Sequence, residues 1–229
     1  MPGIAIIAAF MAGAYLAGFI LFGWLIGKMR GVDIRRHGSM NIGATNCGRV
    51  CGWPCGAAAF VLDVAKGFGP VFLADVVFPR VTGDASKETL HWLLITLVAV
   101  MPIVGHVLPV WLGFRGGKAV ATSLGVLLAM PMLWWLALAV LAVWCVVTGV
   151  TAYVSVGSTV AALALVAGYL WFQRAGAWGP YLPVTVFVLA LVTMVILRHR
   201  SNYVRLLKGT ENRLWGGKKP RGASGEKPR

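Results

Sequence analysis

The sequence predicts an all-α integral membrane protein, a bundle of seven transmembrane helices of which some are short. Of its 229 residues, 59% are hydrophobic and only 12% are charged, whereas a soluble domain has about 25% charged residues. The apolar residues form runs that approach or exceed the roughly 20 residues a bilayer-spanning helix needs. The basic residues, which bring the net charge to +14, cluster between these runs. These three observations exclude an ordinary soluble domain.

The apolar runs can be placed in chain order. The first extends from Met1 to Gly27 and carries no charge before Lys28. It lacks the basic segment at the start of a cleaved signal peptide, so we expect a retained first helix. The second run covers about Trp53 to Phe78, the third Thr89 to Phe114, and the last about Ala175 to Leu197.

The stretch from Ala119 to Gln173 carries no formal charge and determines the topology. Two crossings would fit there, but the basic tail that begins at Arg198 would then lie opposite the basic Arg115–Lys118 loop. Because basic residues favour the cytoplasmic side, we expect three short crossings, separated near Pro131 and near Ser155–Ser158. This gives seven helices with the N-terminus outside and the C-terminus in the cytoplasm. Five full spans with re-entrant segments are the alternative prediction.

The chain ends in a polar, basic segment. We expect one transmembrane domain over residues 1–215, followed by a disordered cytoplasmic tail over residues 216–229. Its charge is typical of a segment beside anionic lipid, so we predict no nucleic-acid partner. Cys47, Cys51 and Cys55 are spaced to share one helix face, yet no fourth ligand of a zinc site accompanies them. We predict no metal, no cofactor and no disulfide, and the sequence leaves the oligomeric state open, a monomer included.

Three polar, glycine-bearing segments share the predicted inner side: Ser39–Arg49, Gly105–Lys118 and His199–Arg213. In the second, Gly116 and Gly117 allow backbone N–H groups to turn toward an anion. Lys118 adds a positive charge, and the next helix begins directly after it. This arrangement suits phosphate, although a basic loop that simply obeys the positive-inside rule is the other interpretation.

The first segment offers further polar groups. It contains the Ser39 and Thr45 hydroxyls, the Asn41 and Asn46 amides, and Arg49, whose guanidinium can bind phosphate through two parallel hydrogen bonds. Turn formation and helix capping are the alternative explanation for its Asn, Ser and Thr residues.

Ionisable residues also occur beside and inside the spans. His199 and Asn202 are three apart and share a helix face, and histidine is suited to proton transfer near neutral pH. His106 is expected to be structural. Asp63 and Lys66 lie three apart within the second run, where ionisable groups usually pair or serve function. We expect an ion pair that serves as a scaffold.

These segments resemble the acyl-phosphate:glycerol-3-phosphate acyltransferases, the PlsY family of bacterial inner-membrane enzymes. The matching stretches run from residue 33 to residue 213: Asp33-Ile34-Arg35, Gly38-Ser39, Asn41-Ile42-Gly43-Ala44-Thr45-Asn46, Leu62-Asp63, Lys66-Gly67, Gly105-His106, Pro109, Gly116-Gly117-Lys118, Ala121-Thr122, Arg198-His199, Asn202, Arg205-Leu206-Leu207, Gly209 and Glu211.

The resemblance implies a seven-helix enzyme with its active site on the cytoplasmic side. Such an enzyme transfers a fatty acyl group from acyl phosphate to the 1-hydroxyl of glycerol 3-phosphate, beside membrane lipid. The expected catalytic residues are Ser39, His199 and Asn202. The expected phosphate-binding residues are Arg49, Gly116, Gly117, Lys118, Ser155 and Asn202. The expected structural supports are Asn41, Thr45, Asn46, Asp63, Lys66, His106 and Glu211.

The sequence departs from the family pattern at several positions. Met40 stands where the family usually has glycine, Ala119 where glycine is common, Arg115 where lysine is frequent, and Cys47 where the residue is usually aliphatic. A glycine at position 40 would serve a backbone with positive φ. Two questions stay open. Either His199 or a substrate phosphate could accept the hydroxyl proton. A transporter is the rival class, although carriers place polar groups at the bilayer midplane, often between internal repeats.

Overall fold

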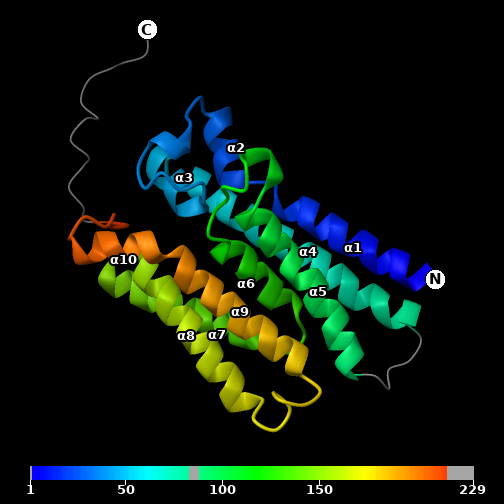
Figure 1. Cartoon of the computed structure of the whole chain (residues 1–229). Helices are drawn as coiled ribbons and strands as arrows, with labels where there is room; N and C mark the ends of the chain where they lie inside the picture. The colour runs from blue at the N-terminus through cyan, green and yellow to red at the C-terminus, as the bar shows by residue number, and fades with distance from the viewer. Residues whose placement is uncertain (1, 83–87, 216–229) are drawn as a thin grey trace, which may run out of the picture.

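The computed structural model describes residues 2–82 and 88–215, and the regular secondary structure of these residues is entirely helical (Figure 1). The α-helices of the described residues are α1 Pro2–Gly18, α2 Phe22–Met29, α3 Ala44–Cys51, α4 Trp53–Thr82, α5 Glu88–Val107, α6 Val120–Ala129, α7 Trp134–Thr151, α8 Val154–Phe172, α9 Leu182–Arg198 and α10 Arg200–Leu207. Short 3-10 turns occur at Ile34–Arg36 and Val110–Leu112. The predicted all-α class is confirmed, and the predicted tail over residues 216–229 lies outside the described residues.

Within the described residues, four helices are long and apolar enough to cross a membrane: α4, α5, α7 and α8. The number rises to six if the bent pairs α1–α2 and α9–α10 each form one span. Helix α6 is a further apolar helix of only 10 residues, so it is about 15 Å long, half of a bilayer core of about 30 Å. The described chain therefore has seven apolar segments, the fourth of them too short to cross alone.

The first apolar run is broken, which the sequence did not indicate. α1 and α2 meet at an angle of 42°, and the break frees backbone carbonyls in an apolar environment. Trp111 Nε1 donates to the carbonyl of Phe19 at 3.0 Å, and Lys66 Nζ donates to the carbonyl of Ile20 at 2.5 Å. Because lipid offers backbone groups no partner, these side chains from other helices make the break tolerable.

The uncharged stretch divides into three helices, as predicted. Pro131 lies between α6 and α7, as expected, but α7 ends at Thr151 and α8 already begins at Val154. The second break therefore precedes the predicted Ser155–Ser158, which instead forms the first turns of α8. Ala152 closes α7 in the left-handed conformation, with φ 61°.

Helices α4 to α6 occupy the middle of the bundle, between α1 on one side and α7 to α9 on the other (Figure 1). α4 and α6 approach closely because Gly67 lies against the carbonyl of Thr122 and Gly125 against that of Val64. A methyl group at either glycine would overlap that carbonyl. Small residues of this kind allow helix backbones to pack in the absence of a hydrophobic driving force.

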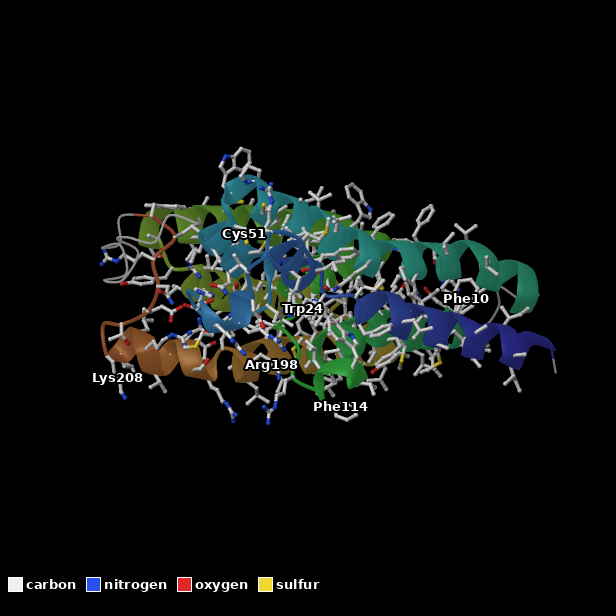
Figure 2. All side chains as sticks on the ribbon, turned by 90° about the horizontal axis from the view of Figure 1, so that it is seen from above. Phe10, Trp24, Cys51, Phe114, Arg198 and Lys208 are labelled. Carbon is white, nitrogen blue, oxygen red and sulfur yellow. The ribbon has the colours of Figure 1, made fainter. Side chains whose placement is uncertain are left out.

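The polar part of the protein lies at one end of the bundle. Helices α2, α3 and α10 gather there, away from the N-terminus (Figure 1). Arg198 and Lys208 lie toward this end, whereas Phe10 lies in the opposite half (Figure 2). The polar segments identified in the sequence therefore come together at one end.

Candidate active site

A cavity of about 410 Å³ lies at this end, within the range of about 300–1,000 Å³ typical of small-molecule sites. Part of its wall is polar and is formed by Ser39, Asn41, Thr45, Asn46, Arg49, Lys118, His199, Ser201, Asn202, Arg205 and Glu211, among others. The remainder is largely apolar and is provided mainly by helices α6 to α9. The cavity is thus suited to a ligand with an anionic head and a long apolar part.

The buried amide of Asn46 organises the first loop. Its nitrogen donates to the carbonyls of Ile34 and Asn41, both at 2.8 Å, and its oxygen accepts from the backbone N–H of Ser39 at 2.8 Å. Met40 adopts φ 58°, so the loop does require positive φ where the family has glycine. The Asn46 amide, placed by the first turn of α3, thereby holds the Ser39 segment against the cavity.

The loop after α5 is held from two directions. The N–H groups of Gly116 and Gly117 donate to the carbonyls of Val107 and His106, both at 3.0 Å. The guanidinium of Arg198 donates to the Gly116 carbonyl at 3.0 Å and to the Gly117 carbonyl at 2.6 Å. Because these glycine amides already have partners, they do not cradle an anion in this arrangement, contrary to the expectation from sequence. They position Lys118 instead.

Lys118 is joined to the third segment by a chain of polar contacts. Its ammonium donates to the side-chain oxygen of Asn202. The Asn202 amide nitrogen donates to Glu211 Oε1 at 2.7 Å, and Arg205 Nε donates to Glu211 Oε2 at 2.8 Å. Ser155 Oγ also donates to Glu211, at 3.3 Å. Glu211 therefore braces the segment, as expected, whereas Ser155 contacts this brace and does not line the cavity.

His199 lies at the junction of α9 and α10 and is almost fully buried, with 2% of its surface exposed. Its Nδ1 lies 2.8 Å from the carbonyl of Val195. Since a carbonyl only accepts, Nδ1 must carry the proton, which leaves Nε2 of the neutral ring as an acceptor. The ring lines the cavity, so His199 has the tautomer that a proton acceptor requires.

The electrostatics of the polar wall favour an anion. Arg49, Lys118 and Arg205 line it together with the carboxylate of Glu211. Burial lowers the pKa of Lys118 to about 8; Glu211 opposes this shift, and the neighbouring arginines add to it. Arg49 Nη2 donates to the carbonyl of Asn212 at 3.2 Å, while its buried Nε has no partner among the described residues. A bound phosphate would relieve both the cation repulsion and this unsatisfied donor.

Asp63, Lys66 and His106 form a buried cluster beneath the loop. Lys66 Nζ lies 2.7 Å from Asp63 Oδ1, which confirms the predicted ion pair, and 2.9 Å from His106 Nδ1. Asp63 and His106 also line the cavity. Because Gly117 packs against the His106 ring, this cluster supports the loop from below.

The structure brings together most of the residues selected from sequence. Ser39, Asn41, Thr45, Asn46, Arg49, Asp63, His106, Lys118, His199, Asn202 and Glu211 line the one cavity, and Gly116, Gly117, Lys66 and Ser155 support it from behind. Sequence reasoning missed the loop-holding role of Arg198, which it treated as a topology signal. It also did not select Ser123 and Ser158 as site residues, although both line the cavity, from α6 and α8. Ser123 lies within an apolar run, and Ser158 was assigned only to a predicted break between two crossings.

The described residues hold no group of three or more His, Cys, Asp or Glu side chains arranged for a metal ion. The four cysteines are all free. Cys47 and Cys55 are buried in a small apolar cluster with Ile34 and Ala59.

The fold and the site define an all-helical integral membrane protein whose cavity has a cationic part and an adjoining apolar part. The comparison with known proteins makes this specific. The profile of the glycerol-3-phosphate acyltransferase family matches residues 8–209, nearly the whole chain. The protein belongs to this family.

Individual relatives agree. A glycerol-3-phosphate acyltransferase of Anaeromyxobacter dehalogenans is 42% identical over 90% of this chain and 96% of its own, and one from Thermosynechococcus vestitus is 41% identical over 88% and 92%. The crystal structure of PlsY, an integral membrane glycerol 3-phosphate acyltransferase, in its glycerol 3-phosphate form is similar with a TM-score of 0.76 and 36% identity, covering 90% of this chain and 94% of that one. The crystal structure of PlsY in its lysophosphatidic acid form is similar with a TM-score of 0.74 and 35% identity, and it covers the same shares of the two chains.

Proposed function

We propose that the protein transfers a fatty acyl group from acyl phosphate to the 1-hydroxyl of sn-glycerol 3-phosphate. The products are 1-acyl-glycerol 3-phosphate and inorganic phosphate, and the reaction is the first acylation step of phospholipid synthesis. The observation that carries this proposal is that the cations Arg49 and Lys118 line the same cavity as an apolar compartment. Membership of the glycerol-3-phosphate acyltransferase family supports the acceptor.

Both substrates have a complementary part of the cavity. The phosphate groups are held by Arg49, Lys118 and Asn202, because guanidinium, ammonium and amide N–H groups are strong donors to phosphate oxygens. The acyl chain enters the compartment between α6, α7, α8 and α9. The reacting carbonyl then lies where the two parts meet, near His199 and Ser39.

The chemistry needs alignment more than activation, since an acyl phosphate is already reactive. The acceptor hydroxyl oxygen attacks the carbonyl carbon, the bond to the phosphate oxygen breaks, and phosphate leaves with its electron pair. Lys118 and Arg49 stabilise the charge that develops on the leaving group. Because one cavity holds both substrates, the hydroxyl and the carbonyl are already close together, which lowers the entropic cost of the reaction. The hydroxyl proton passes to a substrate phosphate or to Nε2 of His199. No covalent acyl-enzyme is required.

The orientation follows from charge. The polar end carries Lys28, Arg30, Arg35, Arg36 and Arg49, and among the described residues after Arg198 also Arg200, Arg205, Lys208 and Arg213. Such clusters favour the cytoplasmic side of a membrane. We therefore place the active site at the cytoplasmic face of the bacterial inner membrane, with the N-terminus outside.

The test is an assay of the purified protein in lipid vesicles. Hexadecanoyl phosphate and glycerol 3-phosphate should give lysophosphatidate, whereas the hexadecanoyl thioester of coenzyme A should give none. Lys118→Ala should abolish most of this activity. Lys208→Ala, a change at an exposed lysine after α10, is the matched control. Uptake of glycerol 3-phosphate without product would favour the transporter, and product from the thioester alone would refute the proposed donor.

A further inference from the structure

The apolar part of the cavity has a defined depth. Four helices line it, and on each the lining residues progress away from the polar end: Val120, Leu124 and Leu127 on α6; Trp144, Leu141 and Val140 on α7; Val154, Ser158, Ala161, Ala162 and Leu165 on α8; Val195, Val192 and Leu191 on α9. From His199 to Leu191 the distance along α9 is about 12 Å at 1.5 Å a residue, and from Val154 to Leu165 along α8 it is about 16 Å.

A layer of four buried residues lies at the deep end of the cavity lining. It is formed by Leu127, Val140, Leu165 and Leu191, one from each of the four helices, and these side chains are only 3–8% exposed. All four also belong to the main hydrophobic core. Because protein cores are close-packed and no residue farther from the polar end on these four helices lines the cavity, we take this layer as the floor of the cavity.

Above the floor, the side chains that line the cavity differ in size between α7 and α8. On α7, Trp144 is held in place because its Nε1 donates to Ser158 Oγ of α8 at 3.2 Å. On α8, the next lining residues toward the floor are Ala161 and Ala162, of which Ala162 is 8% exposed. Small side chains therefore line the wall of α8 between the level of the Trp144 indole and the floor.

We infer that Ala162 and the floor residue Leu165 set the length of acyl chain that the enzyme accepts. This inference rests on the proposed function. The methyl end of the chain reaches the floor through the passage beside Ala162, so a larger side chain at 162 shortens the usable depth. A smaller side chain at 165 lengthens it. Hydrophobic pockets discriminate by roughly 10- to 200-fold for a methylene that does not fit.

The experiment measures kcat/KM with octanoyl, dodecanoyl and hexadecanoyl phosphates at saturating glycerol 3-phosphate. Ala162→Val and Ala162→Leu should lower kcat/KM for hexadecanoyl relative to octanoyl phosphate in graded steps, reaching tenfold or more for leucine. The KM for glycerol 3-phosphate should not change. Ala167→Leu is the matched control, since Ala167 lies on the exposed side of α8 and does not line the cavity.

Leu165→Ala provides a change in the opposite direction and should raise the preference for the longest chain. This second variant keeps the inference testable if the leucine at 162 disturbs folding. If the dependence of kcat/KM on chain length is unchanged in both Ala162→Val and Leu165→Ala, while the wild-type protein is active, this inference is overturned and the proposed function is not. A wild-type protein inactive with every acyl phosphate would instead refute the proposed function.

Discussion

The ammonium of Lys118 donates a hydrogen bond to the side-chain amide of Asn202, and this contact joins the loop after α5 to helix α10. The two residues are 84 positions apart in the sequence. Since Asn202 is in turn held by Glu211 at 2.7 Å, Lys118, the phosphate ligand that we propose, has a fixed position before substrate arrives. Pre-organised charge of this kind is what transition-state stabilisation requires.

The affinity for glycerol 3-phosphate should fall in alkaline solution. Because the pKa of Lys118 is lowered to about 8, its charge is present below that pH and is lost as the pH rises through it. The groups that face Lys118 are Arg49, Arg198, Arg205, His199 and Glu211.

A pH profile checks this prediction. The substrate phosphate completes its second ionisation near pH 6, so a rise in KM above about pH 8 reports on the protein. Lys118→Arg should keep the KM low to higher pH, because an arginine stays charged. A wild-type KM that is flat between pH 7 and about 9.5 would show that Lys118 is not the titrating phosphate ligand.

Arg198 should act through Lys118. Arg198→Lys keeps the charge but loses the several donors that hold the Gly116 and Gly117 carbonyls, so kcat should fall by tenfold or more, about 1.4 kcal/mol. In a protein that already carries Lys118→Ala, Arg198→Lys should lower kcat only slightly. The effects of two residues that act through one another do not add. Equal losses in both backgrounds, measured on folded protein, would assign Arg198 a purely structural role.

His199→Ala should leave measurable activity if a substrate phosphate accepts the proton. The loss of a general base typically costs about 10² to 10⁴ in kcat, whereas loss of positioning alone costs less. The comparison is between the kcat values of His199→Ala and Lys118→Ala, with glycerol 3-phosphate binding measured separately. A loss as large as that of Lys118→Ala, with the acceptor still bound, would identify His199 as the base.

The buried pair Asp63–Lys66 should matter for stability. Lys66→Met leaves the Asp63 carboxylate buried and removes the donor to the Ile20 carbonyl, so unfolding in detergent should become easier by about 3–5 kcal/mol. The double change Asp63→Leu with Lys66→Met should recover part of this loss. Lys28→Met, at an exposed lysine, is the control. Unchanged stability of Lys66→Met would argue against a scaffold.

The sequence predicted the helical class and the gathering of polar loops because both depend on composition and charge. The break at Pro131 was also predictable, because a proline interrupts a helix locally. The break between α1 and α2 was not, because it depends on Lys66 and Trp111 from distant helices. Spacing likewise suggested that the Gly116 and Gly117 amides bind phosphate, since nothing in the sequence shows that carbonyls of α5 already occupy them.

The most direct test of direct acyl transfer counts both products per protein molecule in a rapid-quench experiment. Wild-type protein in vesicles is mixed with hexadecanoyl phosphate, with and without glycerol 3-phosphate. Phosphate and lysophosphatidate should form in equal amounts with the acceptor, and no burst of phosphate should occur without it. A burst equal to the amount of protein would reveal an acyl-enzyme, and phosphate without lysophosphatidate would contradict the proposed activity.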